Sequence, residues 1–177
     1  YNHQHPLSEA CSVLQYNDGT ISCIPKNFFI TPDNKPSSFG IFYIGQCSSM
    51  GIGSTVKYDH PSQILKVGKY VSLGMNIRFI LGSMHNMNTV SIFGFPFIGL
   101  PVAAPNILLG DTELKNDIWI GDEAMILGGV TVNDGCVIGA RSLIPPRKIL
   151  EPYGIYAGNP ARLIRFRFNK KIIELLL

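Results

Sequence analysis

The sequence has few charged residues: Asp, Glu, Lys and Arg make up 15% of it, against 46% hydrophobic residues. A disordered chain needs the opposite balance, because it must carry charge and few apolar groups to remain open in water. The composition therefore excludes a disordered chain. At about 150 residues per domain, the 177 residues predict a single domain that covers residues 1–177.

Long apolar runs are absent as well. No stretch approaches the roughly 20 apolar residues that a helix needs to cross a bilayer. Near Tyr1 there is no basic region followed by an apolar core, the pattern of a secretion signal. We therefore expect no membrane insertion and a cytoplasmic location.

Paired metal ligands are missing too. The four cysteines contain no Cys-x-x-Cys pair, which argues against zinc ribbons and thioredoxin-type chemistry and favours reduced, structural thiols. The aspartates also include no pair spaced as metal ligands. The cysteines and aspartates in question are Cys11, Cys23, Cys47, Cys136, Asp59, Asp111, Asp117, Asp122 and Asp134. The sequence therefore predicts no metal.

The charge is small but unevenly distributed. The whole chain carries +3, while the segment from Arg141 onward has eight Lys or Arg residues against Glu151 and Glu174. A basic end on a slightly acidic body favours an anionic small ligand or a solvated tail over a nucleic-acid surface. We expect no nucleic-acid partner.

A six-residue repeat runs through the second half of the chain. Written in sixes from Leu114, position one is always branched aliphatic and position five is small or β-branched. Position one holds Leu114, Ile120, Ile126, Val132, Ile138 and Ile144, and position five holds Ile118, Ala124, Val130, Cys136 and Ser142. Neither a helical period of 3.6 nor a strand period of two explains this pattern. Short strands joined by sharp turns do, with three hexads forming one coil whose first and fifth residues point inward.

The repeat divides the chain into three parts. Residues 44–150 are expected to form the repetitive β-helix, interrupted by a long excursion at about 81–113, and a loop of that length is usually functional. Residues 1–43 are expected to be a cap segment with a hairpin over Cys11–Ile24, because a stacked coil has an open edge to cover. Residues 151–177 are expected to form a turn over Tyr156–Pro160 and a helix over Ala161–Leu177.

Four motifs within the repeat resemble those of a known family, the hexapeptide-repeat acyltransferases. They are Asp117-Ile-Trp-Ile-Gly121, Ile126-Leu-Gly-Gly-Val130, Ile138-Gly-Ala-Arg-Ser142 and Tyr156-Ala-Gly-Asn-Pro-Ala-Arg162. A second set is similar to the xenobiotic (streptogramin and chloramphenicol) acetyltransferase branch, namely Val67-Gly-Lys-Tyr-Val-Ser-Leu-Gly74, Phe79-Ile-Leu-Gly-Ser-Met-His85 and Phe95-Pro-Phe97. The branch usually has Asn before the histidine and Arg after it, where this chain has Met84 and Asn86.

The resemblance implies an all-β fold, the left-handed parallel β-helix, with a short C-terminal helix. It implies a homotrimer with acetyl-CoA sites between subunits, and a histidine of the excursion as general base in transfer to a hydroxyl. That histidine would be His85. Imidazole titrates near neutral pH, and a positioned base contributes about 10²–10⁴-fold to the rate. Of the other histidines, His3 and His5 lie in the terminal segment, and His60 precedes Pro61 in a second, shorter interruption of the repeat over Lys57–Lys66.

The remaining candidates concern acetyl-CoA. Gly128 and Gly129 could aim backbone N–H groups at the reacting carbonyl oxygen, or could serve only the turn geometry. Trp119, at hexad position six, should point outward and form either a wall of the cofactor site or a subunit contact. The phosphates should meet cationic groups and turns after the repeat: Ala140, Arg141, Gly158, Asn159, Arg162 and Arg165. For Arg167, Lys170 and Lys171 we expect a solvated face.

These features predict an acetyl-CoA-dependent O-acetyltransferase that acts on a sugar, a polysaccharide or a xenobiotic compound. Two alternatives stay open. The same base and cofactor could serve an N-acetyltransferase acting on an amino sugar, and a repeat alone could belong to a non-catalytic β-helical binding protein. Titration with acetyl-CoA separates the enzymes from the binding protein.

Overall fold

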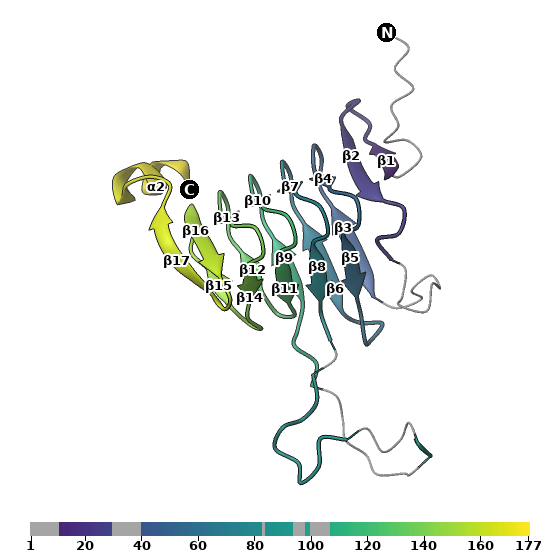
Figure 1. Ribbon diagram of the computed structural model, residues 1–177. Coiled ribbons are helices and arrows are strands. Elements are labelled where there is room, and N and C mark those ends of the chain that lie inside the picture. The colour runs from purple at the N-terminus through teal and green to yellow at the C-terminus, as the bar shows by residue number, and fades with distance from the viewer. Residues whose placement is uncertain (1–10, 30–39, 83, 94–97, 100–106) are drawn as a thin grey trace.

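The computed structural model describes residues 11–29, 40–82, 84–93, 98–99 and 107–177. Its body is a coil of short strands stacked in three sheets, with the excursion projecting away from the coil between β8 and β9 (Figure 1). The first sheet contains β1 (Cys11–Gln15), β2 (Ile21–Pro25), β4 (Ser49–Met50), β7 (Ser72–Leu73), β10 (Trp119–Ile120), β13 (Val137–Ile138), β16 (Gly154–Gly158) and β17 (Ala161–Phe166). The second contains β14 (Leu143–Ile144), β11 (Met125–Leu127), β8 (Arg78–Ile80) and β5 (Thr55–Lys57). The third contains β15 (Ile149–Leu150), β12 (Thr131–Val132), β9 (Thr112–Leu114), β6 (Ile64–Val67) and β3 (Ile41–Ile44).

The strand register follows the repeat. Trp119 of β10 lies opposite Val137 of β13, eighteen positions later in the chain. Strands β11 and β14, and β12 and β15, pair with the same offset. Three hexads therefore make one turn of a parallel coil, as the repeat predicted.

The interior of the coil is formed by the two positions that the repeat singled out. Every position-one and position-five residue from Leu114 to Ile144 has an exposed fraction of 1% or less. Side chains of this kind gain about 1.5–3 kcal/mol each on full burial. The inward direction of these positions is therefore confirmed, and their burial is the main source of stability for the coil.

Acidic residues at the corners serve the backbone. The Oδ1 atom of Asp122 accepts a hydrogen bond from the amide of Met75 at 2.9 Å, and Oδ1 of Asp134 accepts one from the amide of Asn116 at 3.0 Å. A third carboxylate, Asp111, accepts the amide of Ile64 in the same way. These carboxylates join one coil to the next.

The N-terminal hairpin is present as expected. Strands β1 and β2 pair antiparallel, and Asp18 in their turn accepts hydrogen bonds from the hydroxyl and amide of Thr20, which lower the pKa of its carboxyl group. Strand β2 pairs in parallel with β4. The hairpin thus extends the first sheet at its N-terminal end and covers the edge of β4.

The C-terminal segment corrects the sequence prediction. A helix was expected over Ala161–Leu177, but Ala161–Phe166 forms strand β17, which pairs antiparallel with β16, and the turn lies after Gly158. Only α2 (Lys170–Leu176) is helical, with the side chain of Asn169 accepting the amide of Ile172. The last strand of a coil presents unpaired N–H and C=O groups, and pairing them outweighs the local helix propensity of Arg and Leu.

Arg167 also differs from the expected solvated face. Its guanidinium donates to Oδ2 of Asp117 at 3.0 Å and to the carbonyl oxygen of Gly135 at 2.8 Å. It also lies over the rings of Tyr153 and Phe168, 5.6 and 5.2 Å from their centroids. Arg167 therefore fastens the C-terminal segment to the coil. Within the described ranges, no helix is long and apolar enough to cross a membrane.

Candidate functional site

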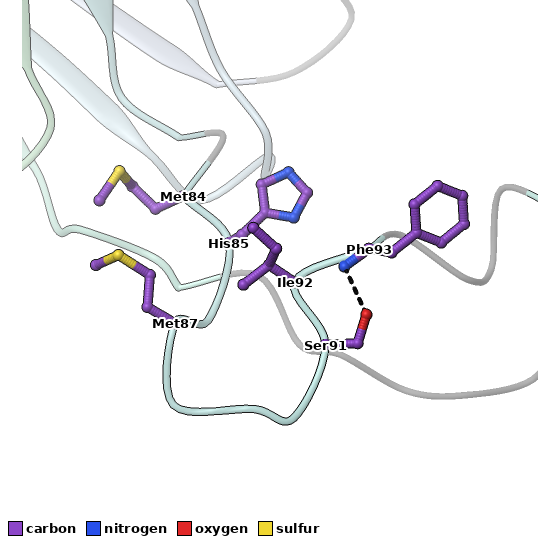
Figure 2. Close-up of a pocket in the computed structure, with 6 residues that line it drawn as sticks. All are labelled: Met84, His85, Met87, Ser91, Ile92 and Phe93. Carbon is purple, nitrogen blue, oxygen red and sulfur yellow. Dashed lines mark hydrogen bonds between the residues drawn. The ribbon is translucent and has the colours of Figure 1, made fainter.

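His85 lies on the outgoing side of the excursion and borders an open hollow of about 660 Å³. Figure 2 shows the residues that line it: Met84, His85, Met87, Ser91, Ile92 and Phe93. Four of these six side chains are apolar. The hollow therefore combines one titratable ring with a largely apolar wall.

Local hydrogen bonds shape the loop that carries these residues. The amide of Asn88 donates to Oδ1 of Asn86 at 3.0 Å, and the hydroxyl of Thr89 lies 2.8 Å from the carbonyl oxygens of both Asn86 and Ser91. The amide of Phe93 donates to the hydroxyl of Ser91. Asx-type turns of this kind let the chain reverse within a few residues. The reversal brings Ser91 and Ile92 back to the same hollow as His85 (Figure 2).

The imidazole of His85 is exposed, and no described side chain orients it by a hydrogen bond. His60, in contrast, has its Nδ1 atom 2.7 Å from the hydroxyl of Ser62, and Nδ1 also accepts the amide of Ser62. His3 and His5 lie outside the described residues. Of the two described histidines, His85 lines this hollow and has a ring without a hydrogen-bond partner among the described residues.

Gly128 and Gly129 form a corner of the coil beside the two roots of the excursion, which are its outgoing end at Leu81 and its returning end at Leu108 and Leu109. Gly129 has a φ of 76°, a left-handed conformation that favours glycine. A Cβ atom on Gly128 would lie 2.5 Å from the carbonyl oxygen of Leu81 and 2.9 Å from Cβ of Leu109, so glycine is required there for space. The corner is thus packed against both ends of the excursion that carries His85.

The cationic candidates and their turns gather at another corner, at the C-terminal end of the coil. The amide of Gly158 donates to Oγ of Ser142 at 3.2 Å, which joins the turn after β16 to the corner that follows β13. Arg162 pairs with Ala157 across the β16–β17 ladder. The residues brought together in this way are Ala140, Arg141, Gly158, Asn159 and Arg162, all of them exposed.

The three arginines of this region differ in their partners. Nε of Arg141 lies 2.8 Å from Oε2 of Glu123, and this hydrogen-bonded pair raises the pKa of Arg141. Arg162 and Arg165 each donate only to a backbone carbonyl of an adjacent residue, and neither forms an ion pair within the described part of the chain. Arg162 and Arg165 are therefore the guanidinium groups available to an anionic ligand.

Trp119 points away from the core, with 58% of its surface exposed. It belongs to an outward column of residues on the first sheet, where Val137 and then Ile155 follow it from strand to strand, and Arg165 lies opposite Ile155. The column places Val137 beside the indole, continues with Ile155 and ends at a cation. This arrangement could accept a ligand with an apolar arm and a charged end.

Within one chain, the candidates lie at two different corners. His85, Gly128 and Gly129 lie where the second sheet passes into the third, and the Arg162 group lies where the first sheet passes into the second. The second sheet stands between them. One copy of the chain therefore does not join its candidate base to its candidate phosphate contacts.

Two residues that the sequence did not single out are important at the excursion corner. The hydroxyl of buried Thr112 accepts the amide of Gly129, and the guanidinium of Arg147 donates to the carbonyl oxygen of Leu108. The only available signal was position: Thr112 begins the strand after the excursion, and Arg147 lies one coil after Gly129. Among the residues that the structure describes, no group of three or more His, Cys, Asp or Glu residues could hold a metal ion.

The sequence model for the bacterial transferase hexapeptide (six repeats) matches residues 111–146. A chloramphenicol acetyltransferase of Agrobacterium fabrum is 40% identical over 126 residues, which are 67% of this chain and 59% of that protein. A probable macrolide acetyltransferase of Lysinibacillus sphaericus is 35% identical over 127 residues, 68% of this chain and 69% of that protein.

Solved structures show the same fold. The crystal structure of a hexapeptide-repeat acetyltransferase from Vibrio cholerae, in complex with acetyl coenzyme A, covers 92% of this chain with a TM-score of 0.62. The match extends over 75% of that protein at 20% sequence identity. Together with the three-sided parallel coil, it confirms the left-handed β-helix as the fold class.

Proposed function

The chain belongs to the hexapeptide-repeat acetyltransferases, in the branch of the chloramphenicol and macrolide acetyltransferases, and on this premise we propose that it transfers an acetyl group from acetyl-CoA to a hydroxyl of an apolar xenobiotic compound. The observation that carries the proposal is the hollow around His85. Met84, Met87, Ile92 and Phe93 offer apolar contact beside one base. A sugar-binding site would need several polar side chains to pair with the hydroxyl groups of the sugar.

His85 serves as the general base in this proposal. Acetyl-CoA supplies the acetyl group as a thioester. The imidazole takes the proton of the acceptor hydroxyl while the hydroxyl oxygen attacks the carbonyl carbon of the acetyl group. The protonated ring then gives that proton to the departing sulfur of coenzyme A. No net proton is gained or lost, so one histidine is sufficient for the cycle.

Negative charge on the reacting oxygen needs a donor, and the corner at Gly128 is the candidate. The amide of Gly129 already donates to Thr112, so we assign the oxyanion contact to the amide of Gly128. Removal of one such donor typically costs about 10²–10³ in kcat. The bond to Thr112 holds the corner and so supports the direction of the Gly128 amide.

The corner formed by Ala140, Arg141, Gly158, Asn159 and Arg162, called the cationic corner below, is proposed to bind coenzyme A together with Arg165. Arg162 and Arg165 have no carboxylate partner among the described residues and suit its phosphates. Arg141 already shares its charge with Glu123, so it contributes less. Ala140, Gly158 and Asn159 supply exposed turn backbone beside them, and Trp119 supplies an apolar wall for the pantetheine arm.

A second copy of the chain is needed to complete this site, because the base and the phosphate contacts lie at different corners. We propose a homotrimer in which the excursion of one copy reaches the cationic corner of its neighbour. Exposed apolar side chains on the excursion support this arrangement, since a single copy leaves them in water: Met87, Val90, Ile92, Phe93 and Ile98. Helix α2 has no buried residue either, although Ile172 and Leu175–Leu177 are apolar.

A cytoplasmic location is part of the proposal. All four cysteines are free thiols, and two of them, Cys23 and Cys47, are not buried. Unpaired thiols that reach solvent persist in a reducing compartment.

The test is a calorimetric titration with acetyl-CoA followed by a screen for release of the coenzyme A thiol. We expect binding of acetyl-CoA, and thiol release with apolar alcohols such as chloramphenicol but not with maltose or glucosamine. Release with glucosamine to give an amide product would favour the N-acetyltransferase, and release with maltose would favour a sugar acceptor. A protein that does not bind acetyl-CoA would contradict the proposal and favour the binding protein.

A further inference from the structure

The excursion that carries His85 is held to the coil at both of its roots by a side chain. At the outgoing root, Nε2 of Gln63 donates to the carbonyl oxygen of Leu81 at 2.7 Å. At the returning root, Nη2 of Arg147 donates to the carbonyl oxygen of Leu108 at 3.2 Å. Gln63 is 3% exposed and lies within the packed body, whereas Arg147 is exposed at a corner.

A short series of hydrogen bonds links Arg147 to the residue beside the base. The amide of Ile107 donates to the carbonyl oxygen of Met84 at 3.1 Å, so the two sides of the excursion pair there in an isolated bridge. Leu108, the next residue, accepts the guanidinium of Arg147. The amide of Arg147 in turn donates to the carbonyl oxygen of Gly128 at 3.0 Å. This series of hydrogen bonds therefore connects Met84, the residue before His85, to the Gly128 corner through Arg147.

The surroundings of Arg147 fit this use. Its Cγ atom packs over Gly129, where a Cβ atom would come within 3.0 Å of it. Arg141 occupies a corner with nearly the same backbone conformation, φ 57° against 56°, but its guanidinium binds Glu123 of the preceding coil. Arg147 forms no ion pair within the described part of the chain, and its guanidinium is directed to the excursion instead.

We propose that Arg147 is a positioning residue that sets the placement of His85 relative to the Gly128 corner. The proposal rests on the proposed role of His85. Arg147 does not touch substrate; it acts by holding the returning end of the excursion at Leu108. A displacement of about 1 Å of a catalytic group can cost about 10²-fold in rate. Loss of the exposed Arg147–Leu108 hydrogen bond leaves the bridge between Met84 and Ile107 in place, so we expect a smaller loss of rate.

The experiment compares Arg147→Ala, Arg147→Gln and Arg147→Lys with Lys148→Ala, an exposed neighbour whose side chain forms no hydrogen bond in the described structure. We expect Arg147→Ala to lower kcat about 3- to 10-fold. Gln and Lys each keep one donor nitrogen and should restore part of this loss. The Kd for acetyl-CoA should stay within about twofold of the wild type, because no cofactor contact is removed. Lys148→Ala should behave as the wild type.

A second readout does not depend on an acceptor. Hydrogen exchange at the amide of Ile107, followed by mass spectrometry, should become faster in Arg147→Ala and remain slow in Lys148→Ala. The melting temperature should hardly change, because Arg147 is exposed. Faster exchange in a protein that does not bind acetyl-CoA would support the Arg147–Leu108 clamp and contradict only the proposed function.

Three results would overturn the inference. The first is unchanged exchange at Ile107 in Arg147→Ala. The second is unchanged kcat with a verified acceptor. The third is a raised Kd for acetyl-CoA with kcat intact, which would make Arg147 a phosphate contact. If Arg147→Ala failed to fold, Arg147→Gln would decide by the same measurements.

Discussion

The amide of Gly129 donates a hydrogen bond to the buried hydroxyl of Thr112, with 3.1 Å between nitrogen and oxygen. This bond separates the roles of two adjacent glycines. Gly129 uses its N–H group to hold the corner to the preceding coil, so it has none to offer a substrate. The N–H group of Gly128 makes no hydrogen bond within the described structure, and the proposed oxyanion contact therefore belongs to Gly128.

Thr112→Val tests the bond between Thr112 and Gly129. Valine has the same shape but no acceptor, so the amide of Gly129 would lose its partner, at a cost of about 1–3 kcal/mol in the free energy of unfolding. Urea denaturation measures the loss. Thr112→Ser keeps the hydroxyl and is the control. Equal stability of the Val variant and the wild type would show that water or relaxation replaces the bond.

His85→Ala should lower kcat by about 10²-fold or more, because it removes the proton transfer that accompanies attack of the hydroxyl. The affinity for acetyl-CoA should change little, since the proposed coenzyme contacts lie at another corner. Steady-state kinetics with a verified acceptor and calorimetry measure the two effects. His60→Ala, an exposed histidine away from the hollow, should be fully active. Near-normal turnover of His85→Ala would exclude it as the base.

Arg162→Ala should raise the KM for acetyl-CoA and leave kcat mostly intact, because the lost contact binds ground state and transition state alike. Comparison with an analogue that lacks the 3′-phosphate identifies the contact. If the substitution weakens both ligands equally, Arg162 does not touch that phosphate. Lys171→Ala, a basic residue of α2, is the control and should have the wild-type KM.

Alkaline pH should destabilise the fold through Cys136. Burial raises the pKa of its thiol to about 11, above about 8.5 in an unfolded chain. Between these values the unfolded thiol has lost its proton and the folded one has kept it, so stability is complete below about pH 8.5 and falls as pH rises towards 11. The effect is at most roughly 3 kcal/mol. Cys136→Ala should be less stable at pH 7 but lose less between pH 8 and 10.5. Parallel pH profiles in urea denaturation would contradict this.

Assembly and activity should be lost together on dilution. If the site combines the excursion of one copy with the cationic corner of another, a lone subunit has half a site. Light scattering and activity over the same dilution series measure both. A fully active species with the monomer mass of 19.5 kDa would contradict the shared site.

The sequence by itself determined the coil, because the first and fifth residue of each hexad had to be buried wherever the repeat continued. Ile120 and Ile126 and their equivalents could therefore be placed inward without a structure. The same period placed Trp119 outward and marked the excursion as the break that carries His85. These features depend on neighbours within one or two hexads, so the six-residue repeat is sufficient to predict them.

The C-terminal segment and the pairing of the site residues were decided only in the tertiary structure. Residues 161–166 have no strand pattern of their own; they become β17 because β16 offers an unpaired edge eighteen residues after β13. Arg141, Arg162 and Arg167 are the same type of residue, but their partners differ. Arg141 binds Glu123, and Arg167 fastens the end of the chain to Asp117. Arg162 has no carboxylate partner in the described structure. Arg147 acquires its contact with Leu108 only because the excursion returns beside it. Such contacts join residues 18 to 50 positions apart, and their partners are set by the stacking of coils, which no local pattern encodes.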